Sequence, residues 1–172
     1  MAITLYEITV PVLLRGLDRL AAVLEKGRAF AEAEGMAEDA LLQARLVAGM
    51  LTLAGQVQRA SDTAKFTAVR IGGVENVAFV DEETSFADLQ ERIARTKAFL
   101  EAVPREAIDG KAGVTINANI GRTPVTIVAE DYALRFALPN FFFHVTTAYD
   151  LLRQAGVPLG KMDFIGPLDG VA

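Results

Sequence analysis

Apolar side chains recur at intervals of three or four residues along four long stretches of the chain. That spacing places them on one face of an α-helix, so the pattern predicts four long amphipathic helices. The first ends at Gly35, the others are expected over about residues 52–71, 85–103 and 130–154, and a short helix is expected over 38–44. The first three apolar stripes are Leu13, Leu17, Leu20 and Leu24; Leu53, Val57, Ala60, Ala64 and Ala68; and Phe86, Leu89, Ile93, Leu100 and Val103.

The first helix has two alternative starting points. Thr4 and Glu7 have the spacing of a capping box, and Ile3 and Ile8 have that of a hydrophobic staple, which would begin the helix near residue 4. Pro11 would then lie inside the helix, where it removes a backbone hydrogen bond. Either the helix is kinked at Pro11 or it begins near residue 9.

One segment has the pattern of a β-hairpin. Residues 114–120 and 123–128 are rich in β-branched side chains, and Gly121 and Arg122 between them suit a two-residue turn. The sequence thus predicts an all-α fold, an up-down four-helix bundle with a small β-hairpin between the third and fourth helices. No repeat or linker divides the chain, so residues 1–172 are expected to form a single domain.

A proline interrupts the predicted fourth helix, whose N-terminus Glu130 and Asp131 favour. A kink at Pro139 would free backbone groups beside Asn140 and His144 and so make room for a ligand. The alternative is a simple break between two packed helices.

Composition narrows the classes of partner. The 172 residues are 52% hydrophobic and 23% charged, as in globular proteins. A net charge of -5 does not suit a phosphate-binding surface, so we expect no nucleic-acid partner. The N-terminal residues lack the features of a signal peptide, and no apolar stretch approaches the roughly 18 residues of a membrane span. We therefore expect no membrane partner and a cytoplasmic location.

Several kinds of chemistry are excluded by residues that the chain lacks. It contains no cysteine, which rules out disulfides, thiolate metal ligands and cysteine nucleophiles. It also lacks a GxSxG elbow, a dinucleotide-binding glycine fingerprint and a phosphate-binding loop. The remaining candidate chemistry centres on the only histidine, His144.

Asn140, His144 and Thr147 form a polar strip on the predicted fourth helix. Ala137 and Leu151 continue the same face at helical spacing, and because they are apolar the face should point inward. Buried polar groups need hydrogen-bond partners from other helices, water or a ligand. His144 is therefore either a metal ligand or general base in a pocket, or a core histidine bound by its neighbours.

The predicted second helix carries polar residues that could complete such a pocket. Gln56, Gln58 and Asp62 are the candidates, and Lys65 follows Asp62 closely. The alternative is an ordinary solvated face, on which Arg59 and Asp62 would form a surface ion pair of small energy. We expect Arg59 and Lys65 to belong to that solvated face.

The C-terminal third of the chain resembles a known family. Residues 137–158, ALPNFFFHVTTAYDLLRQAGVP, together with KMDF at 161–164, look like the last helix of the DinB/YfiT-like superfamily of metalloenzymes. QARL at 43–46 and DTAK at 62–65 are similar to a bacterial branch of that superfamily known as a domain of unknown function. The resemblance covers nearly the whole chain. It implies a four-helix bundle with an interior site between the second and fourth helices, and often a homodimer.

Typical members of this superfamily carry three metal-binding histidines, one on the second helix and a HisxxxHis pair on the last. The resemblance places Asn140 and His144 at the pair, and Gln58 or equally Gln56 at the second-helix position. Two of the three ligands are thus changed, which implies a degenerate metal site where His144 remains and a divalent metal does not bind tightly. The predicted pocket consists of His144, Asn140, Gln58, Asp62 and Thr147.

Three functions are compatible with such a site. The first is binding of a small molecule in the bundle interior by the altered triad. Because some relatives are thiol-dependent transferases or metal-dependent hydrolases, an enzyme of either kind is the alternative. The third is a structural dimerisation module, since Phe141, Phe142 and Phe143 point in three directions and some should face another helix or a partner chain.

Overall fold

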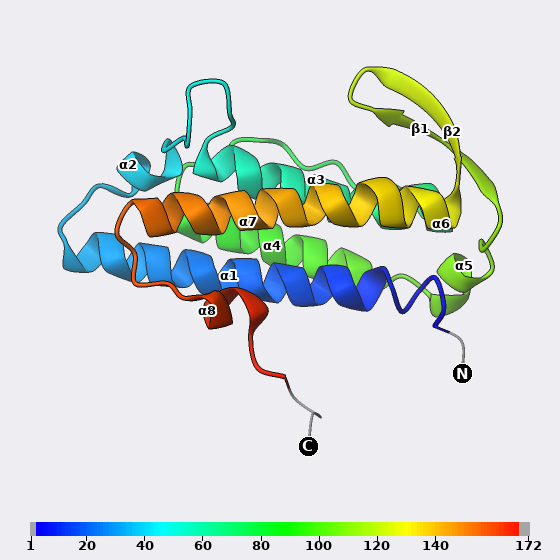
Figure 1. The fold of residues 1–172 in the computed structure, drawn as a ribbon, viewed down its shortest axis with the longest axis horizontal. Helices are drawn as coiled ribbons and strands as arrows, with labels where there is room; N and C mark the ends of the chain where they lie inside the picture. The colour runs from blue at the N-terminus through cyan, green and yellow to red at the C-terminus, as the bar shows by residue number, and fades with distance from the viewer. Residues whose placement is uncertain (1–2, 169–172) are drawn as a thin grey trace.

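The computed structural model describes residues 3–168 and is mainly helical (Figure 1). Four long helices, α1 (Val10–Ala33), α3 (Leu53–Gly72), α4 (Phe86–Glu101) and α7 (Leu138–Gln154), lie side by side along the long axis of this part of the chain. The shorter helices described are α2 (Glu38–Leu42), α5 (Arg105–Asp109), α6 (Ala129–Tyr132) and α8 (Lys161–Ile165). None of the helices within residues 3–168 is long and apolar enough to cross a membrane.

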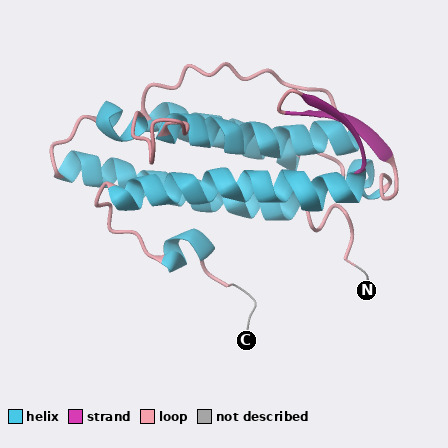
Figure 2. Cartoon of the chain, turned by 45° about the horizontal axis from the view of Figure 1, so that its top comes forward, coloured by secondary structure: helices cyan, strands magenta, loops and turns pink. Residues whose placement is uncertain are grey.

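A small antiparallel sheet completes the described structure. Strands β1 (Thr115–Ile120) and β2 (Thr123–Val128) pair with Ile120 opposite Thr123, and Gly121 in the turn has a φ of 61° that favours glycine. Figure 2 shows the hairpin at one end of the long helices. The predicted combination of a mainly helical fold with a β-hairpin before the last long helix is confirmed.

The apolar stripes of the long helices meet in one core. Leu13 and Leu17 of α1, Val57 of α3 and Leu89 of α4 are fully buried. Helix α1 also approaches α7 closely at Gly16, where an added Cβ would lie 2.3 Å from the ring of Phe141. The core therefore forms where the sequence periodicity places it, and Gly16 is required by the close packing of two helices.

Helix α1 begins at Val10, with Pro11 in its first turn. A proline is tolerated there because the first backbone N–H groups of a helix have no partner within it. Thr4 and Glu7 do exchange hydrogen bonds, of 3.0 and 3.3 Å, but these close a turn that precedes the helix. The later of the two predicted starts is confirmed. The predicted staple is wrong, because Ile3 lies before this turn and is 76% exposed.

The last long helical segment stays helical past Pro139, so the alternative of a simple break between two packed helices is wrong. Helix α6 leads into a π-helical turn, Ala133–Ala137, and then directly into α7. Backbone angles at Tyr132, Ala137 and Leu138 all remain in the right-handed helical region. Because Pro139 donates no backbone hydrogen bond, the regular ladder is already incomplete here, and a wider turn passes this point without breaking the helix.

Candidate functional site

A cleft of about 410 Å³ lies between α3, the α6–α7 segment and the β-hairpin. We call it the α3–α7 cleft. Its lining consists of Arg59, Asp62, Thr63, Phe66 and Arg70 from α3, Phe136, Asn140 and His144 from the last helical segment, Asn119 and Gly121 from the hairpin, and Leu51. The volume is within the range of small-molecule sites.

His144 is bound to a buried amide of α3. Its Nδ1 lies 2.7 Å from Oε1 of Gln56, a residue that is only 1% exposed. The Gln56 Nε2 donates to the carbonyl of Leu51 at 3.3 Å, which fixes the orientation of the amide. Since an amide oxygen only accepts hydrogen bonds, Nδ1 carries the hydrogen, and Nε2 of the neutral ring remains an acceptor in the cleft.

The surroundings of His144 keep the ring neutral at pH 7. Burial, together with the smaller effect of the positive charge of Arg59, lowers the pKa of His144 to about 4. Phe143 covers the ring edge-on, with the two centroids 5.4 Å apart. The histidine is therefore a hydrogen-bond acceptor rather than a cation in this cleft.

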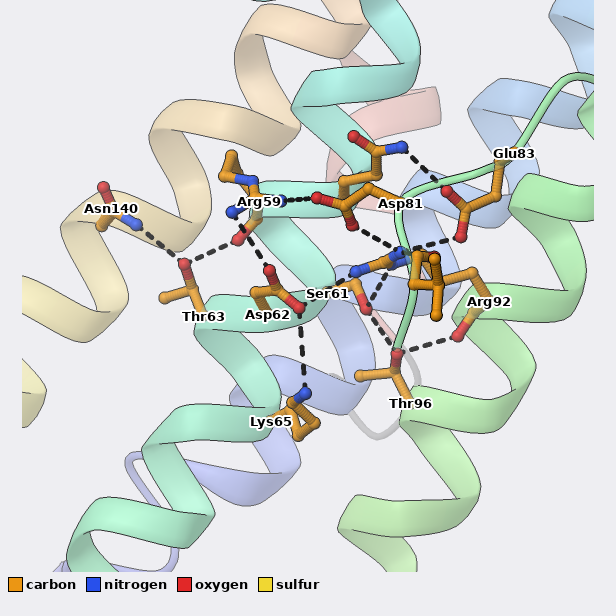
Figure 3. A network of polar contacts seen from close by, with 12 residues as sticks. Arg59, Ser61, Asp62, Thr63, Lys65, Asp81, Glu83, Arg92, Thr96 and Asn140 are labelled. Carbon is orange, nitrogen blue, oxygen red and sulfur yellow. Dashed lines mark hydrogen bonds and ion pairs between the residues drawn. The ribbon is translucent and has the colours of Figure 1, made fainter. Parts of the chain in front are cut away.

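Asn140 is held by a hydroxyl of α3 (Figure 3). Its Nδ2 donates to Oγ1 of Thr63 at 2.7 Å, and the Thr63 hydroxyl donates to the Arg59 carbonyl at 2.7 Å. The Asn140 Oδ1 takes part in no hydrogen bond with any residue between 3 and 168. Asn140 is thus fixed in orientation, with its amide oxygen available to a ligand.

Two residues of the predicted pocket do not line the cleft. Gln58 donates to a carboxylate oxygen of Glu83 at 2.8 Å, so Gln56, the alternative, is the residue that contacts His144. Thr147 is 5% exposed, and its hydroxyl donates to the Phe143 carbonyl in its own helix at 2.7 Å. Its hydroxyl is satisfied within α7. The polar strip predicted for this helix therefore ends at His144.

Asp62 lies in the cleft and also joins a second group of charges (Figure 3). Arg92 of α4 is 2% exposed and lies 3.0 Å from Asp62, 2.9 Å from Asp81 and 2.8 Å from Glu83. Its Nε donates to the Ser61 hydroxyl at 3.1 Å. Although desolvation opposes it, these carboxylates raise the pKa of Arg92. We call this set of five residues the Arg92 network.

The face of α3 predicted to be solvated is partly covered. Lys65 is 2% exposed, donates to the Val77 carbonyl at 2.7 Å and lies over the rings of Phe66 and Phe79 at 4.6 and 4.7 Å. Burial lowers its pKa. The prediction for Lys65 is wrong because the segment between α3 and α4 folds over it. Arg59 has 39% of its side chain exposed, as a surface residue should.

The residues of the cleft do not suit the three-histidine metal site of the superfamily. The Gln56 oxygen is already used by the His144 ring, and amide oxygens are neutral ligands that compete poorly for zinc. Between residues 3 and 168, no three His, Cys, Asp or Glu side chains are placed so that they could hold a metal ion together.

Comparison with known proteins identifies the class and then the family. The structure is similar to the crystal structure of a DinB family member protein from Shewanella denitrificans, with a TM-score of 0.90, 36% sequence identity, and coverage of 98% of this chain and 95% of that chain. A family described as a domain of unknown function, DUF1993, matches residues 5–165, and the chain belongs to it. No curated protein matches the chain. The predicted resemblance to a DinB-like domain of unknown function is confirmed.

Proposed function

We propose that this protein binds a small organic acid in the α3–α7 cleft and does so without a tightly bound metal ion. The observation that carries the proposal is the set of polar groups left open there. A guanidinium that no carboxylate among residues 3–168 pairs with, a histidine acceptor nitrogen and an amide oxygen surround one space. Such convergent polar groups in a partly apolar cleft are typical of small-molecule sites.

Arg70 supplies the positive charge. It donates to the Tyr132 hydroxyl at 2.8 Å and to the Asn119 carbonyl at 3.3 Å, and its guanidinium lies 5.1 Å from the centroid of the Phe66 ring. No carboxylate among the described residues forms an ion pair with it. The side chain is therefore held in place by neutral groups, and its charge remains available for a carboxylate, which suits the planar guanidinium.

The other groups define the rest of the ligand. His144 Nε2 and Asn140 Oδ1 accept hydrogen bonds, so the ligand should carry an O–H or N–H group. Phe66 and Phe136 give the cleft an apolar wall. A hydroxy or amino acid with an aromatic or branched apolar group fits these requirements.

Ligand binding can be tested with a panel of aromatic hydroxy acids and their neutral amides, measured by thermal shift and calorimetry. A ligand that binds only the folded state raises the melting temperature, and the acids should do so while the amides do not. Arg70→Gln should abolish the shift. Arg122→Gln, a matched loss of charge at the hairpin turn, should leave it unchanged. Equal shifts with acids and amides, or an unchanged shift in Arg70→Gln, would contradict the proposal.

Metal content is tested separately, on protein purified without a histidine tag. We expect well under one equivalent of zinc or nickel, because two of the three expected histidines are Gln56 and Asn140. The double variant Gln56→His/Asn140→His should gain a metal ion, since it restores three imidazole ligands. One equivalent of metal in the unaltered protein, lost in His144→Ala, would overturn the metal-free proposal.

We also infer that the four long helices form an up-down four-helix bundle and a single domain, in line with the family match over residues 5–165.

We propose a homodimer in which Phe143, 55% exposed beside the cleft, contacts the second copy. Light scattering should give twice the monomer mass, and Phe143→Ser should reduce it to that of a monomer.

A further inference from the structure

A second cleft, of about 310 Å³, lies between α1, α7 and the C-terminal segment that contains α8. We call it the α1–α7 cleft. Its apolar lining comes from Val12, Phe142, Val145, Phe164, Ile165 and Leu168. Arg15 and Arg19 of α1 are the charged residues of its lining. We propose that this cleft binds a medium-chain carboxylate, with the hydrocarbon chain in the apolar part and the carboxylate on the two arginines.

The apolar part is suited to a hydrocarbon chain. The aromatic rings of Phe142 and Phe164 and the aliphatic side chains around them present almost no polar atoms to the cleft. Transfer of each methylene from water to such surroundings should tighten binding about four-fold, so chain length should determine affinity. A short acid such as acetate would gain little from this site.

Arg15 lines the cleft and also binds the C-terminal segment beside it. Its Nη2 donates to the carbonyls of Ile165 and Pro167, both at 2.8 Å, and this contact holds the segment after α8 against α1. The remaining N–H groups of Arg15 have no hydrogen-bond partner within residues 3–168. They can therefore donate to an anion without releasing the segment.

Arg19 has its charge available in the described structure. No hydrogen bond or ion pair joins it to another residue between 3 and 168. The charge of Arg19 contributes to lowering the pKa of Asp163, but that carboxylate is already bound by Lys26 at 2.7 Å and by the Gly160 N–H at 2.8 Å. In the described part of the chain, Arg15 and Arg19 form no ion pair with a carboxylate, and two such arginines one helical turn apart favour an anionic ligand. The planar fork of N–H groups suits a carboxylate.

The segment after α8 packs closely against the side chain of Arg19. Gly166 has a φ of 76°, and an added Cβ there would lie 2.6 Å from Cδ of Arg19. The arginine side chain thus lies directly against bare backbone. Glycine at this position meets both requirements, a left-handed conformation and room for Arg19 beside the cleft.

Calorimetry with decanoate below its micelle concentration tests the proposal, and it does so independently of the α3–α7 cleft. One decanoate should bind per chain, whereas decanol and acetate should bind at least about ten-fold more weakly, since each lacks either the charge or the apolar chain. Arg19→Gln should weaken decanoate binding about ten-fold. Val12→Trp should abolish it by filling the apolar part. Arg122→Gln, the matched control, should bind as the unaltered protein does.

Circular dichroism establishes that each variant is folded, and Arg19→Gln, at a half-exposed position, provides a test even if Val12→Trp does not fold. Equal binding of decanol and decanoate would overturn the proposal. So would decanoate binding that Arg19→Gln leaves unchanged. Loss of decanoate binding in Arg70→Gln instead would place the fatty acid in the α3–α7 cleft and would likewise overturn it.

Discussion

Helix α3 has two polar sides, and they differ in how completely their groups are paired. On the side of α4, the Arg92 guanidinium lies within 3.0 Å of oxygens of Asp62, Asp81 and Glu83, and almost no water reaches it. On the side of α7, His144 and Asn140 each use one side-chain polar atom to form a hydrogen bond with α3. The other polar atom of each side chain has no partner among residues 3–168. One helix thus carries a fully paired network and a partly paired cleft.

This difference suits the two sides of α3 to different roles. The Arg92 network suits stability of the fold, and the α3–α7 cleft suits the proposed ligand binding. The N–H groups of the buried Arg92 guanidinium are already used by carboxylates and a hydroxyl, and removing the guanidinium takes a close positive partner from each of these carboxylates at high cost. Open acceptors beside a guanidinium can bind a ligand at little cost to the fold. Asp62 belongs to both sides, because it lines the cleft and also lies 3.0 Å from Arg92. Arg59, which also lines the cleft, forms an ion pair with Asp62 at 3.2 Å and so lies between the two sides.

The largest expected effect comes from breaking the paired side. Arg92→Met should lower the free energy of unfolding by about 3–5 kcal/mol, because Asp62 and Glu83 would lose their buried positive partner. Urea denaturation measures this loss. Arg135→Met is the matched control on the outside of the last helical segment, where the side chain is 74% exposed. It should change stability by less than about 0.5 kcal/mol.

A loss below about 1 kcal/mol in Arg92→Met would show that the network contributes no more than a surface ion pair. The two sides of α3 would then not differ as described, because substitutions on either side would cost little stability. Binding of the organic acid should survive in Arg92→Met under conditions where the variant is folded.

The elements that the sequence predicted well are those with local signals. Ser85 and Asp88 form a capping box at the start of α4, and Gly73 ends α3 with a φ of 66°. Both depend on residues within a few positions of each other. The π-helical turn before Pro139 was missed because proline in a helical pattern normally indicates a kink or an end. Helix α5 was missed because its five residues are too few to show a period.

The site was predictable only where a helix face defined it. His144 and Asn140 share a face of α7, and the sequence identified both. Gln56 and Gln58 are two residues apart, so they point to nearly opposite sides of α3, and only the helix rotation decides which one meets His144. The sequence gives no local signal for the Arg92 network, because Asp81 and Glu83 come from the covering segment.

Protonation of His144 tests the partly paired side. The pKa of His144 is about 4 in the folded chain and about 6.5 in an unfolded one, so the unfolded state binds more protons between these values. The free energy of unfolding should therefore fall as the pH falls from about 6.5 to 4, with no further loss from this group below that. The full shift corresponds to about 3 kcal/mol, and partial exposure of the ring reduces the expected loss to about 1–2 kcal/mol.

Denaturation curves of the unaltered protein and of His144→Gln measure this loss. Carboxylates also titrate in the range, but their contribution is shared by both proteins, and His144 is the only histidine in the chain. The difference between the two curves should decrease as the solution is acidified from pH 7 to 4. A constant difference would mean that the ring is not desolvated as the structure has it.

The smallest expected effect comes from changing Arg59, which lies between the α3–α7 cleft and the Arg92 network. Arg59 lies 3.2 Å from Asp62, is paired with Asp81, and lowers the pKa of His144 through its charge. Arg59→Met should therefore raise the pKa of His144, by less than about 1 because the charge is screened by solvent and by its carboxylate partners. Nuclear magnetic resonance can follow the single histidine ring directly.

Stability should change by less than about 1 kcal/mol in Arg59→Met, since the side chain is 39% exposed and ion pairs of that kind contribute little. Arg122→Met controls for loss of a charge elsewhere and should leave the histidine titration unchanged. If Arg59→Met instead destabilised the chain as much as Arg92→Met, Arg59 would belong to the paired network. If it left the pKa of His144 unchanged, Arg59 would have no electrostatic role in the cleft, and Arg70 alone would supply the positive charge for a ligand.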